Sequence, residues 1–271
     1  MRELERELPT DAAPAAGAAP FARLAVIGPG RAGRSIATAA TRAGLAVRLA
    51  GRTDALDACR DSEVALLCVP DDEIVRACAS AAAAIPPLRF VGHTSGATAL
   101  EALSVAREAG AEVFSLHPLQ TIPDDQSELV GAPCAVAGST PATLGLATDL
   151  AARLGMRPFE VPEESRAAYH AAAAMASNLL VALEECAADL LDRAGLDSPS
   201  RELLTPLVLR TAANWAERGP DALTGPIARG DAATVERHLD ALRATAPELV
   251  LVYESLAQRA QALATAAEAG T

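Results

Sequence analysis

Short apolar runs alternate with longer, alanine-rich segments up to residue 161. Several runs, such as 64–69, are apolar throughout, which is typical of parallel strands covered on both faces. The segments between them have the length and composition of helices. This alternation predicts an α/β domain built on a Rossmann-type doubly wound parallel sheet. We expect strands at 24–27, 47–50, 64–69, 89–92, 112–116 and 134–137, with 157–161 as a candidate last strand, and helices at 31–43, 72–83, 97–109 and 141–154.

After Pro162 the strand pattern ends and only helical segments follow. We expect one long helix from Glu163 to Ala194, ended by Gly195, and then three more helices. These three helices are expected at 199–218, 231–244 and 247–267. The sequence therefore predicts two domains, residues 21–162 and an all-α C-terminal domain at residues 163–271. Residues 1–20 are charged and rich in alanine and proline, without the apolar core of a signal peptide, so we expect a disordered leader there.

A glycine-rich turn lies between the first predicted strand and the first predicted helix. Its sequence, Gly28-Pro29-Gly30-Arg31-Ala32-Gly33, has the G-x-G-x-x-G spacing of a dinucleotide-binding loop. Gly28 permits the tight turn, Gly30 lets a pyrophosphate approach the backbone, and Gly33 lets the helix pack close to the strand. The N-terminus of the helix would then hold the phosphates. The motif predicts a dinucleotide site in the 21–162 domain.

The end of the second predicted strand bears on which dinucleotide is bound. In NAD sites an acidic residue about 20 positions beyond the glycines bonds the ribose 2′-hydroxyl. Here that place holds Arg52 and Thr53, with Asp54 following. A guanidinium and a hydroxyl suit a 2′-phosphate better, so we favour NADP(H) over NAD(H) as the cofactor. The alternative is that Arg52 is a solvated turn residue.

Composition and charge exclude several classes of protein. The chain of 271 residues has a net charge of −12 and no basic stripe, so nucleic acid is not an expected partner. All 23 basic residues are arginine, which excludes Schiff-base and pyridoxal-phosphate chemistry. The five cysteines have no metal-ligand spacing, so no metal site is expected, and reduced thiols indicate a cytoplasmic protein.

The longest nearly apolar run, residues 171–183, bears on membrane association. It is too short for a bilayer core of about 30 Å and fits a buried helix, so no membrane partner is expected. The alanine-rich helices suggest a homodimer interface.

Polar residues follow the third and fourth predicted strands, where an open α/β sheet binds its ligands. Val69 ends the third predicted strand and Pro70 and Asp71 follow it, where the backbone could line the nicotinamide ribose. After the fourth strand, His93, Thr94 and Ser95 could bind a carboxylate or carbonyl of a small-molecule substrate. The alternatives are helix capping by the aspartates and an ordinary turn at Ser95-Gly96.

Two histidines are candidates for proton transfer. His117 follows the fifth predicted strand and could act as general acid or base, or simply bond the backbone in a proline turn. His170 lies near the start of the predicted long helix, where Ser177 and Asn178 follow two turns later. The i, i+4, i+8 spacing would place His170 and Asn178 on one helix face, with Ser177 beside them.

With these groups assembled, the chain resembles bacterial Rossmann-like proteins that have a DUF2520 C-terminal domain. These are related to the F420-dependent NADP oxidoreductases and, more distantly, to the 6-phosphogluconate, β-hydroxyacid and prephenate dehydrogenases. The resemblance implies a Rossmann domain followed by a helical domain, often dimeric, and an NADP-linked oxidoreductase whose substrate is not established. It rests on the segments 28–33, 93–97, 115–121, 169–178, 223–226 and 229–231.

The chain also departs from the related dehydrogenases. β-Hydroxyacid dehydrogenases have a catalytic lysine one turn before the helix asparagine, and Ala174 stands there in this sequence. His117-Pro118 is similar to the His-Pro of prephenate dehydrogenases, so His117 or His170 becomes the expected proton-transfer group. The resemblance implies that Asn178 orients the substrate. Arg229 is a candidate partner for a substrate carboxylate.

We therefore expect an oxidoreductase that transfers a hydride between NADP(H) and a small carbonyl, hydroxyl or imine substrate, with Ser95 and Asn178 positioning that substrate. The first alternative is a sensor or interaction module that binds NADP(H) without turnover. The second is a nucleotide triphosphatase, because residues Gly28 to Ser35 match the P-loop motif except that Arg34 replaces its lysine. The sequence leaves open whether a deazaflavin such as F420 takes part.

Overall fold

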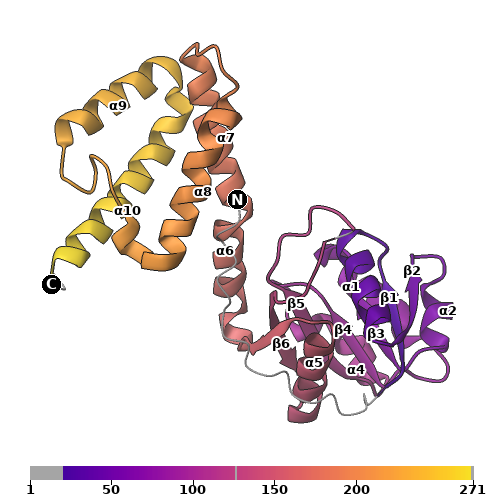
Figure 1. Ribbon diagram of the computed structural model, residues 1–271. Helices are drawn as coiled ribbons and strands as arrows, with labels where there is room; N and C mark the ends of the chain where they lie inside the picture. The colour runs from indigo at the N-terminus through magenta and orange to yellow at the C-terminus, as the bar shows by residue number, and fades with distance from the viewer. Residues whose placement is uncertain (1–20, 126, 270–271) are drawn as a thin grey trace. The chain divides into compact units, whose positions relative to one another are not determined.

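The computed structural model describes residues 21–125 and 127–269 (Figure 1). The predicted leader, residues 1–20, lies outside the described residues. The chain divides into two compact units, Met1–Ala174 and Met175–Thr271. The division therefore falls after Ala174 rather than at the expected residue 162, because side chains just before it bind the sheet of the first unit, as described below.

The first unit contains one seven-stranded sheet, in the order β2-β1-β3-β4-β5-β6-β7. The first five strands are parallel, β6 runs antiparallel to β5, and β7 runs parallel to β6. The Rossmann-type sheet is thus confirmed, with one antiparallel pair that the strand pattern did not reveal. The strands are β1 (Arg23–Ile27), β2 (Ala46–Ala50), β3 (Val64–Leu67), β4 (Phe90–His93), β5 (Glu112–Pro118), β6 (Pro133–Gly138) and β7 (Arg157–Glu160).

Helices cover both faces of this sheet. The α-helices are α1 (Arg31–Arg42), α2 (Ala55–Arg60), α3 (Ile74–Ala82), α4 (Ser104–Glu108) and α5 (Pro141–Arg153), with 3-10 turns η1 (Asp71–Glu73) and η2 (Leu100–Leu103) before α3 and α4. The short helix α2 was not predicted. Its six residues follow β2 directly and give too short a pattern for a periodicity argument.

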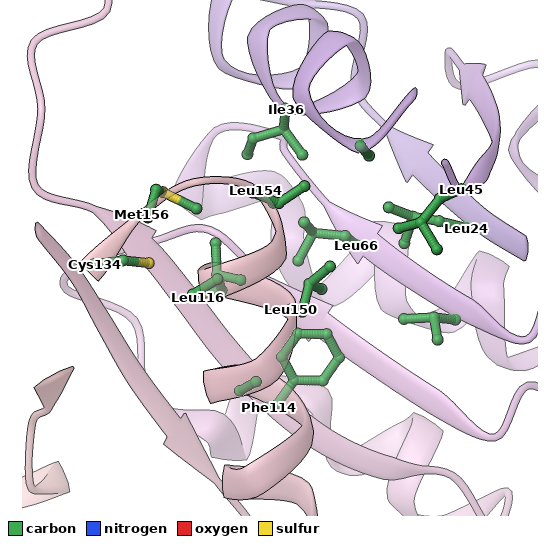
Figure 2. Packing of buried hydrophobic residues seen from close by; sticks show 14 of the residues in the cluster. Leu24, Ile36, Leu45, Leu66, Phe114, Leu116, Cys134, Leu150, Leu154 and Met156 are labelled. Carbon is green, nitrogen blue, oxygen red and sulfur yellow. The ribbon is translucent and has the colours of Figure 1, made fainter. Parts of the chain in front are cut away.

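Alternate residues of each central strand enter two separate cores. Leu24 and Val26 of β1 pack with α1 and α5, whereas Ala25 and Ile27 pack with α2, α3 and α4. Figure 2 shows the first of these cores, where Ile36 of α1 lies among side chains from the sheet and α5. Because a strand side chain alternates in direction at each residue, a run that is apolar throughout satisfies both cores at once.

The second part of the chain is helical. The α-helices are α6 (Arg166–Ala176), α7 (Asn178–Arg193), α8 (Ser200–Arg218), α9 (Ala232–Thr245) and α10 (Val250–Ala269), with 3-10 turns η3 (Glu163–Ser165), η4 (Gly219–Ala222) and η5 (Pro247–Leu249). The all-α C-terminal region is thus confirmed.

The expected single helix from residue 163 to 194 is wrong, because the chain breaks at Ser177. The backbone of Ser177 has φ −125° and ψ −82°, outside the helical region, and α7 starts at the next residue. Serine and asparagine favour helix boundaries because their side chains compete for backbone hydrogen bonds. The spacing rule that placed His170 and Asn178 on one face does not carry across this break.

The apolar run 171–183 is not buried in the single chain, contrary to expectation. Leu179, for example, is 57% exposed and Val181 is 63% exposed. By length and composition, the helical stretch Glu163–Arg193 could cross a membrane, with a mean hydropathy of 1.3 and 6% of its window buried. One such stretch does not by itself establish a span. Exposed apolar side chains in such number favour a protein partner, and the homodimer stays a prediction that a molar-mass measurement in solution tests.

Candidate functional site

The glycine-rich turn between β1 and α1 is shaped by two close approaches. Gly28 has φ +112°, and a Cβ there would lie 2.4 Å from the Cys68 carbonyl oxygen. A Cβ on Gly33 would lie 1.9 Å from the Gly28 carbonyl oxygen. A side chain at either position would force β1, β3 and α1 apart.

Gly30 differs from these two glycines, because a Cβ there meets no atom within 4 Å. It is the N-cap of α1, so the open space lies at the helix N-terminus, where backbone N–H groups have no partner within the helix. In dinucleotide-binding proteins with this motif, the pyrophosphate binds at this position. The turn therefore fits a dinucleotide cofactor on geometric grounds.

A cavity of about 530 Å³ continues from this turn between the end of β2 and one face of α3. Six of the predicted cofactor residues line it, from the glycine-rich turn and the ends of two strands: Gly28, Pro29, Gly30, Arg52, Val69 and Pro70. Sequence reasoning missed the contribution of Glu73, the N-cap of α3, and of Arg76, Ala77 and Ser80 within α3. Their i, i+3, i+4, i+7 spacing marks one helix face, but nothing in that spacing distinguishes a cavity wall from a solvated surface.

The remaining predicted cofactor residues do not line this cavity. Arg31, Ala32 and Gly33 form the first turn of α1, and the Arg31 side chain donates to the Pro123 carbonyl at 3.3 Å. Thr53 lies in the turn before α2, and Asp71 begins the 3-10 turn η1.

The carboxyl ends of β4 and β5 bring a histidine cluster together with the start of α6. The Nδ1 atom of His117 lies 2.6 Å from the Tyr169 hydroxyl oxygen. The rings of His117 and His170 have centroids 5.9 Å apart. Gly96 lies between them, because a Cβ there would be 2.7 Å from His170 Nδ1 and 2.9 Å from His117 Nε2. Both predicted proton-transfer histidines thus converge on a position where only glycine leaves room.

Arg166 is a buried cation beside this cluster, and sequence reasoning missed it. Its side chain donates to the Ser115 hydroxyl at 2.8 Å and to the Ser95 carbonyl oxygen at 3.4 Å, and its Nε lies 3.5 Å from a carboxylate oxygen of Glu163. Arg166 is only 4% exposed. These contacts tie the start of α6 to the ends of β4 and β5, which is why residues 163–174 belong with the first unit. A buried arginine near the start of a helix has no signal in sequence alone.

Burial shifts the pKa values of three groups here, His93, His117 and Tyr169, towards their uncharged forms. Burial, with the nearby His170 ring and the Arg166 guanidinium, lowers the pKa of His117 to about 4. Burial and Arg166 likewise lower the pKa of His93 to about 4. Burial raises the pKa of the Tyr169 phenol to about 12, so this group stays protonated at neutral pH. At pH 7 the imidazoles of His93 and His117 are therefore neutral and the Tyr169 phenol is protonated.

The polar residues after β4 have local roles. The Ser95 hydroxyl accepts from the backbone N–H groups of Ala97 and Thr98 and donates to the Thr98 hydroxyl, so it closes a turn. The Thr94 hydroxyl donates to the Leu67 carbonyl at 3.4 Å, and His93 is fully buried. These contacts favour the turn alternative for Ser95. Ser177, Asn178 and Arg229 lie in the second unit and stay predictions.

The low pKa values of His93 and His117 predict an acid-labile fold. Between pH 6.5 and 4 these histidines take up protons in the unfolded chain but not in the folded one. Stability that is present above pH 6.5 is therefore lost as the pH falls towards 4, on the order of 3 kcal/mol for the fully buried His93. Thermal unfolding at pH 7 and pH 5 measures this loss.

A matched pair of variants separates the buried histidine from a surface one. His93→Leu should reduce the fall of the unfolding temperature with pH, whereas His238→Gln, at an exposed position, should keep it. An unfolding temperature of the natural chain that does not change between pH 7 and pH 5 would contradict this account.

Comparison with solved structures bears out the fold. A proposed NADP oxidoreductase from Bacteroides fragilis matches with a TM-score of 0.74 at 21% identity, over 89% of this chain and 98% of that chain. A protein from Thermotoga maritima matches with a TM-score of 0.71 at 22% identity, over 90% and 99%. A reductive aminase from Aspergillus terreus, solved with NADPH and ethyl-5-oxohexanoate, matches with a TM-score of 0.65 at 18% identity, over 89% and 93%.

Comparison of the sequence with family models assigns the C-terminal part. Residues 132–260 match the family described as Domain of unknown function (DUF2520). No curated protein matches the sequence significantly. The match begins at β6 of the sheet and continues into α10, so it spans the end of the Rossmann-type sheet as well as the helical region. The chain therefore has a Rossmann-type fold, and its residues 132–260 are similar to the DUF2520 family.

Proposed function

We propose that this protein is an NADP-dependent oxidoreductase that acts on a small carbonyl, hydroxyl or imine substrate. The observation that carries the proposal is the open space at Gly30, at the N-terminus of α1, continuous with the 530 Å³ cavity. Gly28 and Gly33 maintain this turn, and Arg52 lies where a 2′-phosphate would bind. Solved structures of similar fold include reductases with NADPH or NADP bound. Bound NADP(H) would supply the hydride chemistry.

The His117–Tyr169 pair would polarise the substrate. Because the Tyr169 phenol stays protonated, it can donate to Nδ1 of neutral His117, which leaves the imidazole proton on Nε2. Nε2 and the adjoining Cε1 are the edge of the ring that approaches Gly96, so this N–H would face a substrate oxygen or nitrogen beside the glycine. A neutral imidazole can stabilise developing negative charge on such an atom without first taking up a proton.

Two alternatives remain distinguishable from this proposal. A sensor or interaction module would bind NADP(H) through the same turn but would show no turnover. The triphosphatase hypothesis needs the Ser35 hydroxyl as a ligand of magnesium. Ser35 is only 3% exposed, and its hydroxyl has no hydrogen-bond partner among the described residues. A buried hydroxyl in the body of α1 cannot reach a magnesium ion on a nucleotide.

The experiment that tests the proposal has two stages. Calorimetric titration with NADPH, NADH and ATP should give tightest binding for NADPH. Oxidation of NADPH is then followed by absorbance with a panel of aldehydes, ketones, keto acids and imines. Binding of NADPH without turnover of any substrate would favour the sensor. Failure to bind either reduced nicotinamide cofactor would refute both of these functions.

A further inference from the structure

One face of α3 presents charged side chains to the cavity opposite the end of β2. Glu73, the N-cap of α3, lies at the start of that face, and Arg76, Ala77 and Ser80 continue it. Arg52, after β2, lines the same cavity from the other side. Two guanidiniums from distant parts of the sequence therefore border one space.

A single carboxylate joins these two guanidiniums. Glu73 Oε2 accepts a hydrogen bond from Arg52 Nη2 at 3.4 Å and another from Arg76 Nη2. The Glu73 side chain is 29% exposed, whereas the Arg52 and Arg76 side chains are 75% and 56% exposed. The carboxylate is the more enclosed partner, and the group of three keeps one excess positive charge.

A simple helix ion pair accounts for only half of this arrangement. Glu73 and Arg76 are three residues apart, a spacing at which such pairs form on many helices. That account does not explain why Arg52, which is 21 residues away in sequence, turns to the same oxygen. Both arginines converge on one acceptor inside a cavity that begins at the glycine-rich turn.

We propose that Glu73 occupies the position of a phosphate monoester in the nucleotide-free protein, and that Arg76 and Arg52 together bind the 2′-phosphate of NADP(H) after it displaces Glu73. This inference rests on the proposed function and names two residues that set its cofactor selectivity. Arg76, from α3, would be a ligand of the phosphate. The Glu73 carboxylate would compete with that phosphate for the two guanidiniums.

Charge and geometry make this exchange selective. A phosphate monoester carries a charge of about −1.5 to −2 at pH 7 and three acceptor oxygens, so it can satisfy two guanidiniums better than one carboxylate does. The neutral 2′-hydroxyl of NAD(H) cannot replace a carboxylate between two cations. NADP(H) would therefore displace the Glu73 carboxylate from the two arginines, whereas NAD(H) would not.

Calorimetric titration of the full-length chain with NADPH, NADH and adenosine 2′,5′-bisphosphate tests this inference. Arg76→Gln should weaken binding of NADPH and the bisphosphate about tenfold, the loss of one charge-assisted contact, and should change NADH binding less than about twofold. Glu73→Gln should strengthen binding of both phosphorylated ligands about fivefold, because the competing carboxylate is gone. The matched control is Arg60→Gln on α2, which removes an exposed arginine paired with Asp57 at the same spacing, 2.9 Å apart. It should change none of the three affinities.

The outcomes separate this inference from the proposed function. If the natural chain binds NADPH but Arg76→Gln binds it equally well, or loses NADPH and NADH affinity to the same extent, the inference is overturned and the proposed function stands. Unchanged binding of the bisphosphate by Glu73→Gln overturns the displacement of the carboxylate. If the natural chain binds neither NADPH nor NADH, the proposed function fails and the inference fails with it.

Discussion

Replacing Gly30 by valine is expected to weaken NADPH binding by at least about a hundredfold, the cost of blocking the pyrophosphate position, and to leave the fold intact. A Cβ at Gly30 meets no protein atom within 4 Å, and its φ of −75° suits any residue. The added side chain would therefore occupy only the space in front of the α1 N-terminus. Calorimetry measures the affinity, and thermal unfolding measures the stability.

Two other glycines provide controls for this substitution. Gly145→Val places the same side chain at an exposed position of α5, where a Cβ also meets nothing within 4 Å, and should change neither quantity. Gly33→Ala should lower the unfolding temperature, since its Cβ would lie 1.9 Å from the Gly28 carbonyl oxygen. If Gly30→Val binds NADPH as tightly as the natural chain, the cofactor does not approach this turn.

Replacing His117 by asparagine is expected to lower turnover of the best substrate in the panel about a hundredfold or more, the usual cost of losing one donor to a developing charge. NADPH affinity should change little, because His117 does not line the 530 Å³ cavity. The pKa of about 4 adds a pH signature. The His117 imidazole stays neutral from pH 8 down to about pH 5, so turnover should show no titration near 6.5 that belongs to this residue.

Tyr169→Phe tests the tautomer of His117 separately. It removes the hydroxyl at 2.6 Å from Nδ1 without removing the imidazole, so turnover should fall about tenfold, less than in the histidine variant. His238→Asn, which changes an exposed histidine bonded to Tyr253 in the helical region, serves as the control. Full turnover by His117→Asn would remove this residue from the mechanism and leave His170 as the candidate.

Much of the fold could be predicted because its signals are local. The strands of the sheet were found as short apolar runs, and Gly195 ended the helix where the glycine was expected to end it. Besides the short helix α2, two features of the fold were missed because no local pattern signals them. The break at Ser177 needs only one residue to leave the helical region, and the antiparallel direction of β6 depends on how a connection packs.

The candidate site was predictable only where it follows strand ends. His117 was singled out because the end of β5 lies at the ligand-binding edge of any such sheet. Arg166 was missed because its burial comes from contacts with Ser95 and Ser115, which are 71 and 51 residues away in sequence. Glu73 and Arg76 were missed because a charged helix face usually faces solvent. Only the fold brings Arg52, 21 residues away from Glu73 in sequence, to this face.

The sequence by itself determined the class of the fold and the place of the glycine-rich turn, because periodicity and backbone freedom are properties of adjacent residues. Only the tertiary structure decided which charged groups meet. Arg52 and Arg76 share one carboxylate, and His117 and His170 converge on Gly96, through contacts between separate elements. The physical reason is that burial and electrostatic pairing depend on distances in space, which the order of residues along the chain does not contain.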